Sequence, residues 1–161
     1  MTEIALLADR PDVIDTLTRW FRAQWSDYYA GRDSAEIAQD FHREARRTGL
    51  PIRLVAFVAN ELAGTIILRQ QVIRDAPEYS PGLGGLLVAE RQRKRGIGTE
   101  LVRAGMETAK TEGYETIYAT TNTAESILER LGWTPVKAVS HGDEQLQLYQ
   151  CDLSHQPLSI A

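Results

Sequence analysis

A basic segment followed by two glycines gives the second half of this chain residues that could bind phosphate. Residues 91–95 contain four Arg or Lys side chains, and Gly96 and Gly98 follow them directly. An apolar run over residues 83–89 precedes the segment, and a helical pattern begins at Thr99. Backbone N–H groups at a helix N-terminus carry about half a positive charge and point toward a bound anion. Glycine lets the backbone approach such a ligand closely, so we predict an anion site here.

The same segment is compatible with other roles. A glycine pair in a basic loop is a weak motif, because a tight turn with a solvated basic surface would use the same residues. A nucleic-acid surface is disfavoured, since the formal net charge is −4 and no second basic stripe is present. A dinucleotide-binding domain is disfavoured because the loop follows a late strand and lacks the three-glycine fingerprint. A small anionic ligand therefore fits best, and we expect no nucleic-acid partner.

Length and composition indicate one globular domain. The chain has 161 residues, of which 43% are hydrophobic and 25% are charged, values typical of such a domain. We predict a domain over residues 1–153 and a frayed C-terminal tail over residues 154–161. A single cysteine, Cys151, excludes an internal disulfide. We find no signal peptide and no run of about 18 apolar residues, so we expect a cytoplasmic protein without membrane contact or a metal.

Hydrophobic periodicity predicts a mixture of strands and helices. Helices are expected over about 13–25, after an N-cap at Ser34, from Thr99 until Gly113, and after an N-cap at Asn122. Strands are expected over 3–8, 52–59, 64–73, 83–89, 114–121, 133–139 and 145–153, with a hairpin turn at Asn60-Glu61. Residues 83–89, the helix after them and residues 114–121 form a parallel β-α-β unit. The glycine loop then lies at the C-terminal end of a central strand, where open sheets place ligands.

Two motifs in this order resemble the GCN5-related N-acetyltransferase (GNAT) superfamily. The family's acyl-CoA signature, Arg/Gln-x-x-Gly-x-Gly/Ala, is present as Arg93-Lys-Arg-Gly96-Ile-Gly98. Its closing motif, usually Asn…Tyr-Glu-x-x-Gly-Phe, corresponds to residues 122–133, which end in Gly132-Trp133. The resemblance spans almost the whole chain. It implies an α/β (α+β) fold with a mixed, mostly antiparallel sheet, a splayed parallel pair of central strands, and flanking helices.

The resemblance also implies where acetyl-CoA, the co-substrate, would bind. Backbone amides from residues 93–99 would hold its pyrophosphate, with the Arg93 and Lys94 side chains near the outer phosphates. The backbone of Leu86 and Val88 would pair with the pantetheine arm, an N–H near Leu87 or Val88 would polarise the thioester carbonyl, and Asn122 would contact the pantetheine. The implied cofactor-binding residues are Leu86, Leu87, Val88, Arg93, Lys94, Arg95, Gly96, Ile97, Gly98, Thr99 and Asn122.

One departure from the family concerns proton transfer. Many members place a Tyr near the CoA sulfur as general acid, and the matching position here is Leu128, which has no proton to donate. Ser126, Tyr118 or Tyr79 could replace it, as could a water molecule, or the thiolate could leave unaided. We predict Ser126 as the acid, although a solvent-facing hydroxyl is the simpler interpretation of this residue.

The acceptor side is less well defined by the sequence. Asp75 and Glu78 precede the central strand and Glu90 follows it, so each is a candidate general base; we predict Glu78, although most surface carboxylates are only solvated. The predicted acceptor-binding residues are Trp25, Tyr28, Tyr29, Asp75 and Tyr79. The aromatic faces and the one negative charge of residues 25–29 suit a cationic or aromatic amine. The aromatic residues could equally cover the edge of the core.

We therefore predict an N-acetyltransferase that moves an acetyl group from acetyl-CoA to a primary amine by direct attack. The amine could belong to a small molecule or to a peptide N-terminus. A non-catalytic acyl-CoA sensor is the alternative, because Leu128 occupies the position of the acid. A homodimer is a further possibility implied by the resemblance.

Overall fold

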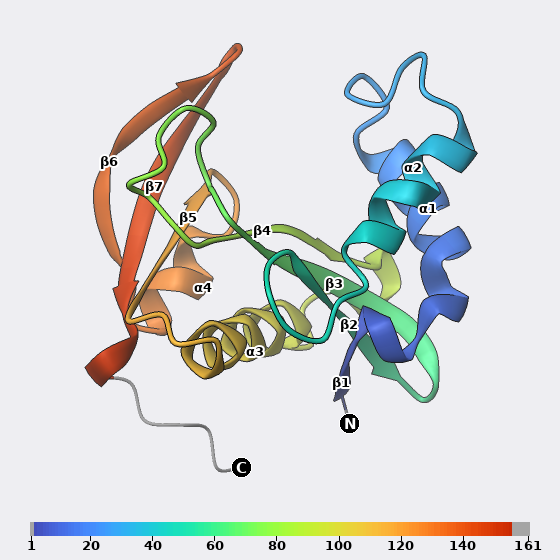
Figure 1. The fold of residues 1–161 in the computed structure, drawn as a ribbon, viewed down its shortest axis with the longest axis horizontal. Helices are drawn as coiled ribbons and strands as arrows, with labels where there is room; N and C mark the ends of the chain where they lie inside the picture. Colours follow the sequence, from blue (N-terminus) through green and yellow to red (C-terminus); the bar gives the residue numbers. More distant parts are fainter. Residues whose placement is uncertain (1, 156–161) are drawn as a thin grey trace.

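The computed structural model describes residues 2–155, and their strands form a sheet in the order β1-β2-β3-β4-β5-β7-β6 (Figure 1). The strands are β1 (Thr2–Leu6), β2 (Ile52–Val58), β3 (Glu61–Arg69), β4 (Gly82–Val88), β5 (Thr116–Thr121), β6 (Thr134–His141) and β7 (Glu144–Asp152). The α-helices are α1 (Ile14–Gln24), α2 (Ser34–Arg43), α3 (Ile97–Thr111) and α4 (Glu125–Arg130). Short 3₁₀ turns are formed by Leu7–Asp9, Pro11–Val13, Glu90–Gln92 and Leu153–His155. Part of the predicted tail, residues 156–161, lies outside the described residues.

The two central strands confirm the predicted splayed pair. β4 and β5 run parallel, while the other neighbouring strands are antiparallel. The β4–β5 register contains one residue pair, Gly82 with Tyr118, and the Tyr118 N–H donates to the Pro81 carbonyl at 3.0 Å. Both residues lie in the first half of their strands. The strands therefore separate toward their C-terminal ends, so the β4 backbone near Val88 has no strand neighbour on its β5 side.

The sheet has an apolar layer on each face. One core contains the buried side of α3, Leu128 of α4, and inward-facing residues of β2 to β5 and β7. The other contains α1 and α2 packed on Val55, Phe57 and Leu87. In Figure 1, α3 lies across one face of the sheet, and α1 and α2 stand over its β1–β3 side. The hydrophobic periodicity from which these helices were predicted therefore corresponds to their buried sides.

Helix α3 approaches the sheet closely because a glycine lies at the contact. A Cβ atom built on Gly105 would lie 2.5 Å from Cδ1 of Leu83 on β4. Both residues are part of the α3-side core, and the contact is shorter than any real Cβ atom tolerates. The missing side chain therefore sets the spacing between α3 and the strand that precedes the basic loop.

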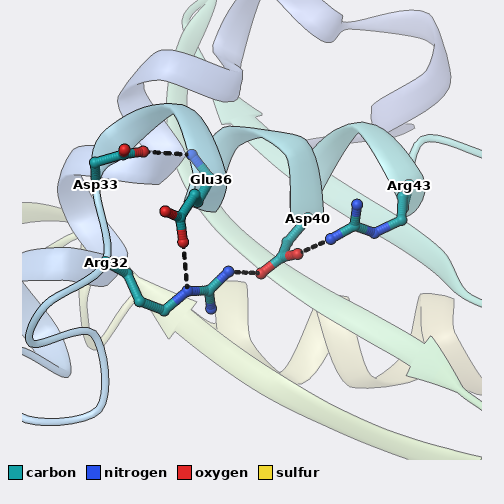
Figure 2. Close-up of polar contacts among 5 residues, drawn as sticks. All are labelled: Arg32, Asp33, Glu36, Asp40 and Arg43. Carbon is teal, nitrogen blue, oxygen red and sulfur yellow. Dashed lines mark hydrogen bonds and ion pairs between the residues drawn. The ribbon is translucent and has the colours of Figure 1, made fainter.

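A network of charged side chains fixes the start of α2 and the loop before it (Figure 2). The Asp33 carboxylate caps the helix by accepting the Glu36 N–H at 2.8 Å. Arg32 contacts Glu36 at 3.8 Å and Asp40 at 2.7 Å, and Arg43 completes the network on the other Asp40 oxygen. The cap is therefore Asp33, so the prediction of Ser34, which is the first helical residue, was wrong by one position.

Three other local predictions were also wrong. The β2–β3 hairpin turns at Ala59-Asn60, with φ of 51° and 67°, rather than at Asn60-Glu61. Strand β3 ends at Arg69 instead of residue 73, because the chain turns away into a loop over residues 70–81. Asn122 does not cap α4, since the Thr121 hydroxyl accepts the N–H groups of residues 123 and 124 instead. Each error concerns the exact residue at which an element begins or ends.

Candidate functional site

A cavity of about 480 Å³ lies beside the C-terminal half of β4, next to the separation of β4 and β5. Its walls come from β4, the basic loop with the start of α3, the segment leading into α4, and the end of α1. The lining residues are Leu86, Leu87, Val88, Gln92, Arg93, Lys94, Gly96, Ile97, Gly98, Thr99, Thr123, Ala124, Ile127, Arg130 and Gln24. The predicted anion segment therefore borders a cavity rather than a flat surface.

The basic loop presents backbone donors to this cavity. Lys94 and Gly96 have positive φ angles of 65° and 81°, which turn the chain sharply before α3 begins at Ile97. The first helical hydrogen bond runs from the Glu100 N–H to the Gly96 carbonyl at 3.0 Å. The N–H groups of residues 97–99 precede that bond and have no partner within the helix. Together with the helix dipole they form an anion-binding end.

The side chain of Arg93 stabilises the loop. Its Nε atom donates to the Val88 carbonyl at 3.1 Å and so joins the loop to the end of β4. Lys94 and Arg130 add two more positive side chains to the lining, and Arg130 also contacts the Thr99 hydroxyl at 3.4 Å. The cavity therefore combines oriented backbone donors with mobile cations, the donor set that a phosphate-containing ligand requires.

Gly98 provides the space at the base of the cavity. A Cβ atom there would lie 3.2 Å from Cδ1 of Ile127, 3.8 Å from Leu86 and 3.9 Å from Val88. Ile127 belongs to α4, whereas the other two contacts belong to β4. A larger side chain at this position would therefore project between the two walls of the cavity, in front of the N–H groups that begin α3.

Most of the predicted donor-binding residues are brought together here, and two are not. Leu86, Leu87, Val88, Arg93, Lys94, Gly96, Ile97, Gly98 and Thr99 line the cavity. Arg95 does not; its guanidinium contacts Gln92 at 3.5 Å. The Asn122 amide points elsewhere and donates to Glu144 at 3.3 Å, while its neighbours Thr123 and Ala124 line the cavity instead. The role predicted for Asn122 remains a prediction.

Sequence reasoning missed several lining residues. Gln24, Gln92, Thr123, Ala124, Ile127 and Arg130 border the cavity. The three α4-side positions 124, 127 and 130 repeat at helical spacing, so a helical projection of the closing motif would have found them. Gln24 lies more than sixty residues before the motif, and no local pattern marks it.

The α4 helix offers no acid toward the cavity at the position that the family reserves for Tyr. Leu128 is buried in the α3-side core. Ser126 is exposed and is not part of the cavity lining. A buried phenol, Tyr149 of β7, donates to Glu129 at 2.8 Å, and this hydrogen bond together with burial raises the pKa of Tyr149 to about 12. Its proton is therefore held in the fold.

The aromatic residues predicted on the acceptor side belong to the loop between α1 and α2. Trp25 lies edge-on to Phe21 with ring centroids 4.9 Å apart, and Tyr28 lies edge-on to Tyr29 at 4.8 Å. Tyr28 is 73% exposed, whereas burial raises the pKa of the Tyr29 hydroxyl. Arg32, held by the α2 network in Figure 2, lies 5.7 Å from the Tyr29 ring centroid. The structure therefore presents an ordered aromatic surface next to α2.

The loop over residues 70–81 carries the other acceptor-side candidates. Asp75 and Glu78 are exposed, and Asp75 has a φ of 66°. Tyr79 is half-buried and lies edge-on to Tyr118 of β5 at 5.4 Å, with the Lys137 ammonium 5.3 Å from its ring centroid. Tyr79 therefore contacts the β5–β6 side of the molecule, whereas Trp25, Tyr28 and Tyr29 belong to the α1–α2 side.

No group of three or more His, Cys, Asp or Glu side chains within residues 2–155 is arranged to hold a metal ion. No helix in that part of the chain has the length and apolar character needed to cross a bilayer.

Comparison with known proteins gives a consistent picture. The model of the acetyltransferase (GNAT) family matches residues 12–133. No curated protein sequence matches the chain. Among solved structures, aminoglycoside 6'-N-acetyltransferase complexed with coenzyme A is 20% identical, with a TM-score of 0.74, 96% of this chain covered and 99% of the other. The yncA protein of Salmonella typhimurium, solved with its cofactor acetyl-CoA, is 17% identical, with a TM-score of 0.72 and 99% of both chains covered. At these identities the structural likeness establishes the fold.

Proposed function

The chain belongs to the acetyltransferase (GNAT) family, and from this premise we propose that it transfers an acetyl group from acetyl-CoA to a primary amine by direct attack of the amine. The observation that carries the proposal is the cavity beside β4, with the unpaired N–H groups of residues 97–99 and the cations Lys94 and Arg130 in its wall. These groups fit a pyrophosphate. Acetyl-CoA, when bound, supplies the acetyl group as an activated thioester.

The separated strands provide the second part of the donor site. Beyond the Gly82–Tyr118 pair, the β4 backbone has no strand partner on its β5 side, so the peptide groups of Leu86 and Val88 are free to pair with an extended amide-containing chain. An N–H near Leu87 or Val88 would donate to the thioester oxygen, which gains negative charge during attack. One such donor contributes about 2.7–4 kcal/mol in enzymes where it has been removed.

The attacking amine must be neutral. An alkyl amine with a pKa of about 10.4 costs roughly 4.6 kcal/mol to deprotonate at pH 7, whereas an α-amine near 7.7–8.0 costs roughly 1.2 kcal/mol. We propose Glu78 as the base that accepts the proton, directly or through water, with Asp75 beside it in the exposed loop. Because both carboxylates are exposed, the acceptor itself would complete this part of the site.

Departure of the thiol does not require a strong acid. A thiol with a pKa near 8.5 leaves as a thiolate far more readily than an alkoxide would. Leu128 is buried and Ser126 lies outside the cavity lining. We therefore propose that the thiolate departs unaided and is protonated by water, with Ser126 as an acid only if α4 moves.

The proposal is tested by binding and turnover measured separately. Isothermal titration with CoA and acetyl-CoA reports donor binding, and a thiol-release assay over a panel of primary amines reports transfer. Binding with release supports the enzyme. Binding without release from any amine would favour the non-catalytic acyl-CoA sensor, and no binding at millimolar CoA would refute both.

Two broader proposals accompany this function. A cytoplasmic location is supported by the single cysteine, which is buried on β7 and forms no disulfide. A homodimer is supported by the edge strand β6, where Val136 is 39% exposed. Sedimentation velocity at two protein concentrations tests the dimer, and fluorescence microscopy of the tagged protein in its own cell tests the location.

A further inference from the structure

Arg69, the last residue of β3, places a guanidinium group on the sheet face opposite α3. Side chains alternate along a strand, so Arg69 shares its face with Thr65 and Ile67, whereas Leu68 belongs to the α3-side core. The Arg69 side chain extends over β4: a Cβ atom built on Gly84 would lie 2.7 Å from its Nη2 atom. Gly84 therefore lies directly beneath this guanidinium.

A second guanidinium lies beside the neighbouring glycine, but it is already neutralised. A Cβ atom on Gly85 would lie 3.6 Å from Nη2 of Arg53. Arg53 is 3% exposed, and its Nε donates to Glu44 at 2.6 Å while its Nη1 donates to the Thr65 hydroxyl at 3.1 Å. The Phe21 and Phe41 rings lie 5.1 and 5.0 Å from the same guanidinium. Arg53 is thus a fully partnered structural group.

Arg69, in contrast, has its charge available. Within residues 2–155, no hydrogen bond or ion pair engages its guanidinium. The side chain is exposed, yet burial lowers the pKa of Arg69, and the charge of Arg53 lowers it further. Glu44 is the acidic group that acts on it, and Glu44 is already paired with Arg53.

This position adjoins both parts of the acceptor side. Tyr29 packs against the α1–α2 core, which covers the same face of the sheet as Arg69. Arg69 pairs in register with Gly82, which in turn pairs with Tyr118, the ring partner of Tyr79. Along β4, Gly84 stands two residues before Leu86, a separation of no more than about 7 Å.

We propose that Arg69 binds an acidic group of the acceptor, so that the acceptor is an amino acid or another small amine that carries a carboxylate. This inference rests on the proposed function and specifies its substrate class. A guanidinium binds a carboxylate through two parallel hydrogen bonds, with directional preference as well as attraction. Because Gly84, beneath the guanidinium, is close to Leu86, the acceptor must carry its amine and its acidic group only a few bonds apart. A polycationic acceptor would instead bring its charges against an unneutralised Arg.

The experiment compares matched amines with the full-length protein and saturating acetyl-CoA. Each α-, β- or γ-amino acid is paired with its carboxamide, and an aminoglycoside and a diamine represent cationic acceptors. The carboxamide amine is the less basic of each pair, because the neighbouring carboxylate stabilises the ammonium form. Preference for the amino acid would therefore oppose intrinsic reactivity and report recognition of the acid.

Two variants alter the guanidinium in different ways. Arg69→Met removes the charge at similar length, and Gly84→Ala displaces the flexible guanidinium end by its new methyl group. Arg103→Met, on the exposed side of α3, removes the same charge from the other face and serves as control. We expect Arg69→Met to raise KM for the amino acid about 10- to 100-fold, with KM for the carboxamide changed less than about 2-fold. Arg69→Lys should recover part of the loss.

The outcomes separate this inference from the proposed function. If CoA binds and amines are acetylated, but acids gain nothing over carboxamides or Arg69→Met changes both equally, the inference is wrong and the function stands. Failure of CoA binding refutes the function itself. Should no amine turn over, thermal shifts of the CoA-saturated protein with N-acetylated amino acids decide: a shift that Arg69→Met abolishes supports the inference, and no shift overturns it.

Discussion

Substitution of Gly98 by Glu should abolish the stabilisation of the protein by CoA. The new side chain would begin 3.2 Å from Cδ1 of Ile127, project between β4 and α4, and place a carboxylate in front of the N–H groups of residues 97–99. It would occupy the cavity of about 480 Å³ with both volume and negative charge. A phosphate ligand would then meet steric overlap and like-charge repulsion at the same point.

The expected magnitude follows from linkage. At a ligand concentration of 100 times Kd, binding to the folded state adds about 2.7 kcal/mol to the free energy of unfolding. For a chain of this size, 1 kcal/mol corresponds to about 2–4 °C in Tm. CoA should therefore raise the Tm of the unchanged protein by about 5–11 °C, as converted from the same stabilisation, and leave the Tm of Gly98→Glu unchanged.

The unliganded variant should remain folded, which makes the assay interpretable. An acidic residue in the first turn of a helix is favoured by about 0.3–1 kcal/mol. Differential scanning fluorimetry with and without CoA measures the shift. Gly98→Ala adds a methyl group without charge and should retain part of the CoA-induced Tm shift. Gln39→Glu, on the exposed side of α2, adds the same charge elsewhere and should retain the full shift. A full CoA-induced shift in Gly98→Glu would refute the placement of the donor site.

Three further predictions concern the fold that holds the site. The hydrogen bond to Glu129 raises the pKa of Tyr149 to about 12. The neutral phenol therefore contributes stability that is complete below about pH 10 and declines as the pH rises toward 12. Urea unfolding from pH 8 to 12 should show a smaller decline in the free energy of unfolding for Tyr149→Phe than for the unchanged protein. Gly105→Val would force a side chain into Leu83 and should lower the free energy of unfolding by about 1–3 kcal/mol, whereas an unchanged urea midpoint would contradict the close α3–β4 packing. Glu44→Ala would leave Arg53 buried without its ion pair and should lower the free energy of unfolding by about 3–5 kcal/mol, measured by urea unfolding. A loss below 1 kcal/mol would show that Thr65 and the aromatic rings are enough to stabilise the buried guanidinium.

The donor site was predictable because its determinants are contiguous. Strand, basic loop and helix start occupy residues 83–99, and the positive φ at Gly96 and the unpaired N–H groups of α3 are consequences of that local order. Arg93 illustrates the limit of such reasoning. Its residue type suggested a phosphate ligand, yet its Nε atom binds the Val88 carbonyl, a contact that depends on how the loop folds back.

The remaining lining residues depend on packing between distant elements. Gln24 lines the cavity because α1 ends beside β4, and the periodicity of α1 does not predict which element its end will contact. Asn122 was predicted to cap α4, but the Thr121 hydroxyl accepts the N–H groups of residues 123 and 124, and no side chain caps the helix at Ala124. Arg69 was assigned to the middle of a strand expected to reach residue 73, so its terminal position and its approach to Gly84 emerged only from the β3–β4 register.

The two halves of the proposed reaction are therefore encoded in different parts of the chain. The donor cavity draws mainly on residues 86–99 and 123–130, which include the acyl-CoA signature and most of the closing motif. The acceptor-side groups, Arg69 with Tyr28 and Tyr29, precede those motifs, and Arg69 lies on the sheet face that α1 and α2 cover. Structures about 20% identical to this chain share its fold. The guanidinium of Arg69, unpaired within the described chain, is the observation on which we base the proposal of an acidic amine as acceptor. Replacing residues 25–33 and 69–81 with the corresponding segments of another family member should therefore change the acceptor that is acetylated, while the affinity for CoA stays the same.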